Sequence, residues 1–147
     1  MSKMITSLDT TLDSMDDKSI GLAYEAEDYL LGLEQEEVTT EHVLHGGMYH
    51  RTILIKEGVT ISGALIKIPT TLIVNGECSV YIGDRVVECK GYGIIPAEAN
   101  RKQIIHAIKD TMLTMCFPTS ATTVREAEDE FTDESDRLMS RTELGKN

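Results

Sequence analysis

The chain has 147 residues and a formal net charge of −11, which is unevenly distributed. Residues 1–41 carry a net charge of −9 and residues 119–147 carry −4, whereas residues 42–118 carry +2. This length suits one domain with a modest core, and the lack of clustered Lys and Arg argues against nucleic acid or an anionic membrane surface as a partner.

No segment approaches the roughly 18 consecutive apolar residues that a membrane-spanning helix needs. The residues from Met1 to Asp9 also lack the basic and then apolar stretch of a secretory signal. The cysteines Cys78, Cys89 and Cys116 lie in apolar, strand-like surroundings without a Cys-x-x-Cys pair. We therefore expect a cytoplasmic protein with buried, reduced thiols and no membrane partner.

Residues 1–41 are predicted to form an acidic helical arm. Leu8, Leu12 and Met15 recur at the spacing of one helix face. A second and longer helix is predicted after them, with Ser19 as its N-cap. Its apolar stripe consists of Leu22, Ala26, Tyr29, Leu30 and Leu33.

From His42 the apolar period changes from helical to two, which indicates β-strands. The segment that holds His42 and His45 is expected to be a loop. Asn75-Gly76 is the strongest hairpin signal of the chain, and Gly83-Asp84 predicts another turn. Short strands with turns at this spacing predict an antiparallel barrel or sandwich. The strands are expected at 49–56, 60–68, 72–74, 77–82, 85–89, 103–107 and 111–117.

After Pro118 the helical period returns. Thr123 and Glu126 have the spacing of a capping box at a helix N-terminus. An apolar stripe follows, and the acidic side chains Asp129, Glu130, Asp133 and Glu134 are expected to face water, with a loose tail from Thr142. The stripe consists of Val124, Ala127, Phe131 and Leu138.

The turn pattern of residues 42–118 resembles the cupin superfamily. The residues that carry the resemblance are Gly58, Gly63, Asn75-Gly76, Gly83-Asp84 and the run from Gly91 to Pro96, which are similar to the two cupin motifs and the hairpin between them. The resemblance implies a jelly-roll barrel that binds its ligand at the mouth.

A narrower resemblance is to small bacteriophage-encoded cupin-like proteins of unassigned function. It rests on the run from Met48 to Ile53, on Ser62-Gly63, and on Lys109-Asp110-Thr111 before the last predicted strand. These motifs consist of turn glycines and β-patterning, so they specify a fold far better than an activity.

The cupin resemblance also implies a metal site, but the residues at its positions are unsuitable. Counted from Gly58, the two histidine positions are Ala64 and Ile66, and the acidic position is Thr70 or Thr71. Counted from Pro96, the histidine position of the second motif is Arg101. Aliphatic side chains and a guanidinium do not bind metals. We therefore expect neither metal nor cofactor, and a pocket that is partly turned into core.

The weak alternative for a metal site is His50 with His106, which requires their two strands to be neighbours. No acid or thiolate joins them at close spacing, so ordinary hydrogen-bonded histidines are favoured. No catalytic residue is identified, because the chain has no phosphate-binding loop, no nucleophile elbow and no base beside a cysteine.

The bases and aromatics near the expected barrel mouth indicate a small anionic ligand. Arg101 in particular is expected to place a fixed positive charge at the rim. The predicted ligand-binding residues are Arg51, Lys67, Tyr81, Arg101 and His106.

Together these patterns predict a mainly β protein with one cupin-like antiparallel β-barrel, or jelly roll. The barrel spans residues 42–118, between an acidic N-terminal helical arm (1–41) and a C-terminal helix and tail (119–147). Amphipathic arms and edge strands predict a homo-oligomer, most simply a dimer. The candidate interface residues are Leu30, Leu33, Val124, Phe131 and Leu138.

The function favoured by the sequence is a non-enzymatic, metal-free binding module, phage-encoded, for a small or anionic ligand or a host protein. The alternative is a structural or assembly protein of a virion, in which the helical arms make the contacts. The first places the chain in the host cytoplasm and the second in the virion. A second alternative is a metal-dependent or isomerase-type cupin enzyme, although no catalytic residue supports it.

Overall fold

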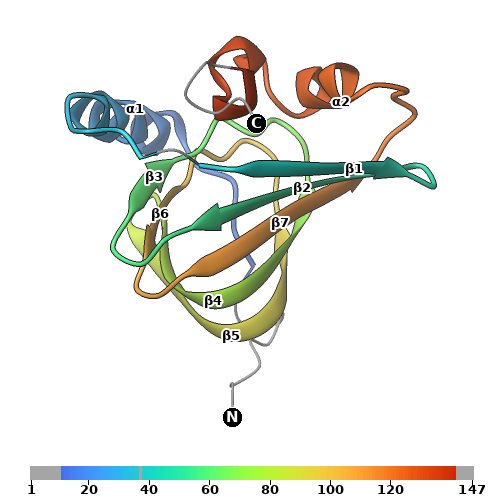
Figure 1. Ribbon diagram of the computed structural model, residues 1–147. Coiled ribbons are helices and arrows are strands. Elements are labelled where there is room, and N and C mark those ends of the chain that lie inside the picture. The colour runs from blue at the N-terminus through green and yellow to red at the C-terminus, as the bar shows by residue number, and fades with distance from the viewer. Residues whose placement is uncertain (1–10, 37, 142–147) are drawn as a thin grey trace.

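The computed structural model describes residues 11–36 and 38–141, and in it one antiparallel sheet curls into an open barrel (Figure 1). The helices lie over one end of this barrel, and neither of those described is long and apolar enough to cross a membrane. The predicted mainly β fold is confirmed.

The helices are α1 (Asp17–Leu31) and α2 (Val124–Phe131), followed by the short 3-10 turns η1 (Ser135–Arg137) and η2 (Met139–Arg141). The strands are β1 (Thr40–His45), β2 (Met48–Ile55), β3 (Thr60–Ser62), β4 (Thr70–Ile82), β5 (Arg85–Ala97), β6 (Ile104–Ala107) and β7 (Thr111–Pro118).

The strand β4 joins the two halves of the curled sheet. The strand order is β1-β2-β7-β4-β6-β3, and β5 pairs with β4 along its whole length. Residues 71–75 of β4 also pair with β7, whereas residues 78–81 pair with β6. Between these two stretches Gly76 has a φ of 150°, and Gly91, opposite it on β5, has a φ of 89°. Because glycine adopts such angles most readily, the β4–β5 hairpin bends there from one half of the sheet to the other.

The predicted hairpin at Asn75-Gly76 is therefore wrong. Both residues lie inside β4, and the chain reverses at Gly83-Asp84, where a turn was also predicted. A Cβ atom on Gly76 would lie 2.6 Å from Oγ1 of Thr111 and 2.7 Å from the carbonyl oxygen of Asp110. Glycine thus allows the close approach of two backbones at this bend.

The core lies between the inner faces of the strands and includes residues from both arms. Along β5 every second residue from Val87 to Ala97 is buried, as expected for a strand with one inward face. Phe117 of β7 packs edge-on against Tyr49 and against Phe131 of α2, with ring centroids 5.4 Å and 6.1 Å away. Leu12 of the N-terminal arm is completely buried. The arms therefore belong to the barrel's own core.

The N-terminal arm differs from its prediction at two places. Residues 11–15 form no helix, so the first predicted helix is wrong there, and Leu8 lies outside the described residues. Leu12 instead forms a parallel bridge with Ala97 at the end of β5. The N-cap of α1 is Asp16 and not the predicted Ser19. Asp16 accepts a hydrogen bond from the backbone N–H of Ser19, and its negative charge suits the positive end of the helix dipole.

The segment with His42 and His45, predicted as a loop, is the strand β1, which pairs antiparallel with β2. Gly46 and Gly47 form the two-residue turn between them, and both have positive φ. The sequence does not indicate this strand, because three of its six residues are His or Thr and the alternation of apolar and polar residues is weak.

The C-terminal segment begins as predicted, with Thr123 capping α2 through the N–H of Glu126 at 3.2 Å. The helix ends at Phe131 and is shorter than predicted. Leu138 therefore lies beyond α2, although it is buried in the same core. The tail predicted from Thr142 lies outside the described residues.

Candidate functional site

A pocket of about 720 Å³ lies at the end of the barrel that carries the helices. The barrel supplies one part of its lining, from β2, β3, β4, β6 and β7. The second half of α1, the segment from residue 33 to 40, and residues 131–139 supply the other part. This volume lies in the range of about 300–1,000 Å³ that is typical of small-molecule sites.

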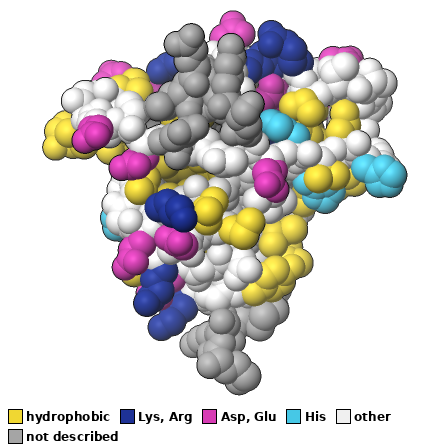
Figure 2. Space-filling view, viewed as in Figure 1, with side chains coloured by type: hydrophobic (Ala, Val, Ile, Leu, Met, Phe, Trp, Pro, Cys, Tyr) yellow, Lys and Arg dark blue, Asp and Glu magenta, His cyan; other side chains and the backbone are white. Residues whose placement is uncertain are grey.

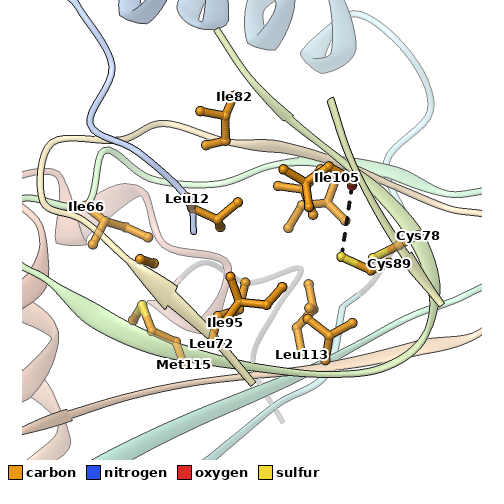
Figure 3. Packing of buried hydrophobic residues seen from close by; sticks show 14 of the residues in the cluster. Leu12, Ile66, Leu72, Cys78, Ile82, Cys89, Ile95, Ile105, Leu113 and Met115 are labelled. Carbon is orange, nitrogen blue, oxygen red and sulfur yellow. Dashed lines mark hydrogen bonds between the residues drawn. The ribbon is translucent and has the colours of Figure 1, made fainter. Parts of the chain in front are cut away.

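The barrel side of the pocket is mostly apolar. Ala64 and Ile66, the residues at the positions of two cupin metal ligands, both line it, as the cupin motifs imply. Figure 3 shows that side chains from several strands converge on the same interior space. Of the side chains labelled there, the pocket lining includes Ile66, Leu72, Ile105, Leu113 and Met115.

A buried ion network holds the C-terminal segment against the barrel wall. Arg51 of β2 lines the pocket, and its Nη1 lies 2.9 Å from Oε2 of Glu128 on α2. Arg141 binds the other oxygen of Glu128 at 2.8 Å, and Ser140 donates to Oε2 at 2.7 Å. Burial opposes ionisation of Glu128, but the hydrogen bonds from Ser140 and Arg141 and the charge of Arg51 lower its pKa. We call these four residues the Glu128 network.

A second network joins α1 to the barrel and to the C-terminal segment. The fully buried Nζ of Lys102 lies 2.7 Å from Glu27, 3.5 Å from Glu134 and 4.3 Å from the ring centre of Tyr24. Arg137 pairs with the same two acids at 2.9 Å and 3.7 Å. Burial and the hydrogen bond to Glu134 raise the pKa of Tyr24 to about 12, so its hydroxyl remains a donor. We call these five residues the Lys102 network.

The Lys102 network should weaken in acid. Burial opposes the ionisation of Glu134, but hydrogen bonds from the Leu65 N–H and the Tyr24 hydroxyl lower its pKa. A carboxyl whose folded pKa lies below its unfolded value of about 4.3 stabilises the fold above that pH, and this contribution is lost as the pH falls through the folded pKa. We expect the free energy of unfolding in urea to fall below about pH 4.3. It should fall less steeply in Glu134→Gln, and equal slopes would contradict this assignment.

The charges of the lining favour an uncharged ligand. Its two bases, Arg51 and Arg137, are already paired with acids. Glu34 and Glu36 are exposed in the lining and make no ion pair within the described ranges. An anion would meet no unpaired base among the described lining residues and would lie near these two carboxylates, which is unfavourable in a partly buried site.

The prediction that Arg101 places a positive charge at the rim is wrong. Its side chain is completely buried and does not line the pocket. The guanidinium donates to Oγ1 of Thr70 at 2.6 Å, to Oε1 of Gln103 at 3.2 Å and to the carbonyl of Glu98. Burial lowers the pKa of Arg101 to about 10, with Glu98 opposing, so the side chain stays charged at neutral pH. It folds inward because residues 98–103 form a loop whose polar groups need an internal donor.

Three other residues predicted to bind a ligand do not line the pocket. Lys67 lies at the surface and pairs with Asp133. Tyr81 is exposed on β4, and His106 of β6 is hydrogen-bonded to Oγ1 of Thr60 on β3 at 2.7 Å. Arg51 is thus the one residue of the five predicted that the structure brings into this lining.

The two histidines of the alternative metal site are not brought together. His50 lies on β2 and His106 on β6, and β7 and β4 separate these strands. Among the residues the structure describes, no group of three or more His, Cys, Asp or Glu side chains could hold a metal ion. The alternative site, which required the two strands to be neighbours, is therefore not formed, because β7 and β4 lie between them in the sheet.

The candidate interface residues on the C-terminal segment belong to the core of the same chain. Phe131 and Leu138 are only 2% and 8% exposed, and Val124 packs against the same cluster. Leu30 and Leu33 of the N-terminal arm line the pocket, and Leu33 is 49% exposed. Figure 2 shows hydrophobic side chains gathered on the right flank of the barrel, away from both helices. A helical apolar stripe indicates a buried face, but it does not indicate which surface covers it.

The three cysteines are unbridged and buried, as predicted. Cys78 and Cys89 are directly opposite each other on β4 and β5, inside the barrel (Figure 3). A hydrogen bond with Cys89, followed by burial, raises the pKa of Cys78 and keeps its thiol protonated. Neither of these two cysteines lines the pocket.

Sequence reasoning missed Glu128 and placed Glu134 in water, although both are central to a network. For Glu128 a signal was present, because it lies four residues after Val124 and three before Phe131, on the apolar face of α2. An acid on such a face requires a cationic partner. For Glu134 and for the pocket residue Gln103 no local pattern distinguishes them from surface residues.

Comparison with known proteins supports the fold. No protein-family model matches this sequence, and no curated protein matches it. Among solved structures, it is similar to ectoine synthase from P. lautus, with a TM-score of 0.50 and 16% identity, covering 67% of this chain and 75% of that chain. A double-stranded β-helix protein from Klebsiella pneumoniae gives a TM-score of 0.48 and 18% identity, covering 60% and 79%. A cupin-2 domain protein from Shewanella frigidimarina gives 0.46 and 8%, covering 62% and 90%.

Proposed function

We propose that this chain, which has the cupin fold, is a binding module for a small, largely apolar and uncharged molecule. The observation that carries this proposal is the pocket of about 720 Å³ with aliphatic walls at the positions where cupin motifs place metal ligands. A ligand that buries about 300 Å² of apolar surface there gains about 7.5 kcal/mol, before the loss of its own freedom of motion.

The two ion networks support a binding site rather than a packing defect. Apolar cavities in proteins are rare because close packing of the surrounding side chains stabilises the fold. Here the Glu128 network and the Lys102 network fix the C-terminal segment and α1 against the barrel. These fixed polar contacts keep the apolar walls apart without a ligand, so the site is preformed.

The proposal is testable with two matched fluorescent dyes, the uncharged N-phenylnaphthylamine and the anionic anilinonaphthalene sulfonate. We expect saturable binding of the uncharged dye together with a rise in Tm, and weaker binding of the anionic dye. Ala64→Phe should weaken binding of the uncharged dye at least about tenfold, since the half-buried Ala64 lines the pocket and the added ring would occupy it.

The matched control is Val86→Phe, which adds the same ring on the exposed face of β5, where Val86 is 46% exposed and outside the lining. This variant should bind the uncharged dye as the wild type does. Unchanged binding by Ala64→Phe would show that the dye binds elsewhere. Tighter binding of the anionic dye at the pocket would overturn the proposal that its ligand is uncharged.

A further inference from the structure

A buried amide side chain lies among the aliphatic residues of the pocket wall. Gln103 precedes β6, lines the pocket and is 5% exposed. Its backbone is fixed because its carbonyl accepts a hydrogen bond from the N–H of Gly63 at 2.9 Å. Ile66 and Ile105, which also line the pocket, are aliphatic. A buried amide is unfavourable unless its polar atoms are hydrogen-bonded, so this position requires an explanation.

The amide of Gln103 is held in one orientation. Its Oε1 accepts a hydrogen bond from Nε of Arg101 at 3.2 Å, and guanidinium groups only donate. Arg101 is itself fixed by Thr70 and by the carbonyl of Glu98. The amide therefore cannot flip, and its Nε2 must be the group that remains for another partner.

Nε2 of Gln103 is a donor that reaches open space. No acceptor contacts it within residues 11–36 and 38–141. It is also not among the described side-chain atoms that are sealed from solvent without a partner. Since Gln103 is 95% buried and lines the pocket, the open space that Nε2 reaches is the pocket.

Arg101 strengthens this donor. The guanidinium makes no ion pair in the described part of the chain, and its hydrogen bonds go to uncharged groups. A charge-assisted hydrogen bond to Oε1 polarises the amide and makes the Nε2–H groups more acidic. A ligand oxygen that meets Nε2 also feels the buried positive charge behind it, and this favours an atom with partial negative charge.

We infer that Gln103 Nε2 donates a hydrogen bond to a carbonyl oxygen on the bound molecule. The ligand class is therefore an uncharged ketone, aldehyde, ester or amide with an apolar body. This inference rests on the proposed function of the pocket. A site with a fixed, otherwise unpaired donor discriminates against a molecule that lacks the acceptor, because binding such a molecule leaves the buried donor without a partner.

Benzophenone and diphenylmethane test the inference, since they differ only by a carbonyl in place of a methylene group. Each would compete with N-phenylnaphthylamine for the pocket, and the measurement is the ratio of their two Kd values. In Gln103→Glu the preference for benzophenone should fall about tenfold relative to the wild type. The carboxylate keeps the contact with Arg101, so the fold is retained, but it replaces the donor by an acceptor.

Gln103→Met provides a second variant, with no donor and no added charge, and it should lose the same preference. The carbonyl stretching band of bound benzophenone should lie at lower wavenumber in the wild type than in either variant, which a purely structural role of Gln103 would not produce. If the dye binds and the ratio is equal in all three proteins, this inference is wrong and the proposed function stands. If neither the dye nor the competitors bind the wild type, the proposed function itself fails.

Discussion

Replacing Gly76 with alanine should destabilise the protein by about 4 kcal/mol or more. The new Cβ would lie 2.6 Å from Oγ1 of Thr111 and 2.7 Å from the Asp110 carbonyl oxygen, and the backbone of β7 cannot retreat because β2 and β4 hold it on both sides. The residue would also have to adopt a φ of 150°, which side chains other than glycine rarely tolerate. Urea unfolding monitored by circular dichroism measures the loss.

Gly46→Ala is the matched control for this prediction. Gly46 lies in the β1–β2 turn with a φ of 61°, and nothing lies within 4 Å of a Cβ added there. It should lose about 1 kcal/mol from backbone strain alone. Equal losses in the two variants would show that the close approach of β4 and β7 contributes nothing.

Gly76 also shows why the hairpin predicted at Asn75-Gly76 is wrong. An Asn-Gly pair between apolar runs is typical of a tight hairpin, and the same pair suits a strand that bends while another backbone passes close to it. The two cases differ only in which strand lies opposite, and here that strand begins at Thr111, 35 positions further along the chain. Alternation within one strand carries no such ambiguity, so β2, β6 and β7 were predicted nearly to their ends.

For the candidate site too, spacing along the chain placed some residues correctly and failed for another. The cupin resemblance assigned Ala64 and Ile66 to the ligand-binding interior, and the pocket lining contains both. It also assigned Arg101 to the mouth, but the loop before β6 turns this side chain inward to Thr70 and Gln103. Spacing along the chain specifies where a Cα lies on a known barrel. The direction of a long side chain on an irregular loop depends on hydrogen bonds that spacing does not encode.

The second large effect is expected from Glu128→Gln, which should reduce the free energy of unfolding by about 3–5 kcal/mol. The side chains of Arg51 and Arg141 are 11% and 9% exposed, and both have Glu128 as a carboxylate partner. The glutamine side chain keeps the shape but cannot neutralise Arg51, whose ion pair in the described residues is the one with Glu128. Arg141 keeps Asp129 and Asp136 at 3.2 Å and 3.6 Å but loses its most buried partner. Thermal and urea unfolding at neutral pH give the measurement.

Glu25→Gln, at an exposed site on α1, is the control and should leave stability unchanged.

A double-mutant cycle then separates the ion pair from other effects of the substitution. Arg51→Met combined with Glu128→Gln should lose less stability than the sum of the single losses, because the double variant no longer buries the Arg51 charge opposite an uncharged amide. The dye should also bind more weakly to Glu128→Gln, since the network fixes Phe131 and Leu138, two walls of the pocket, against the barrel. Additive losses in the cycle would mean that Arg51 and Glu128 act independently, and the C-terminal segment would then be held by its apolar contacts alone.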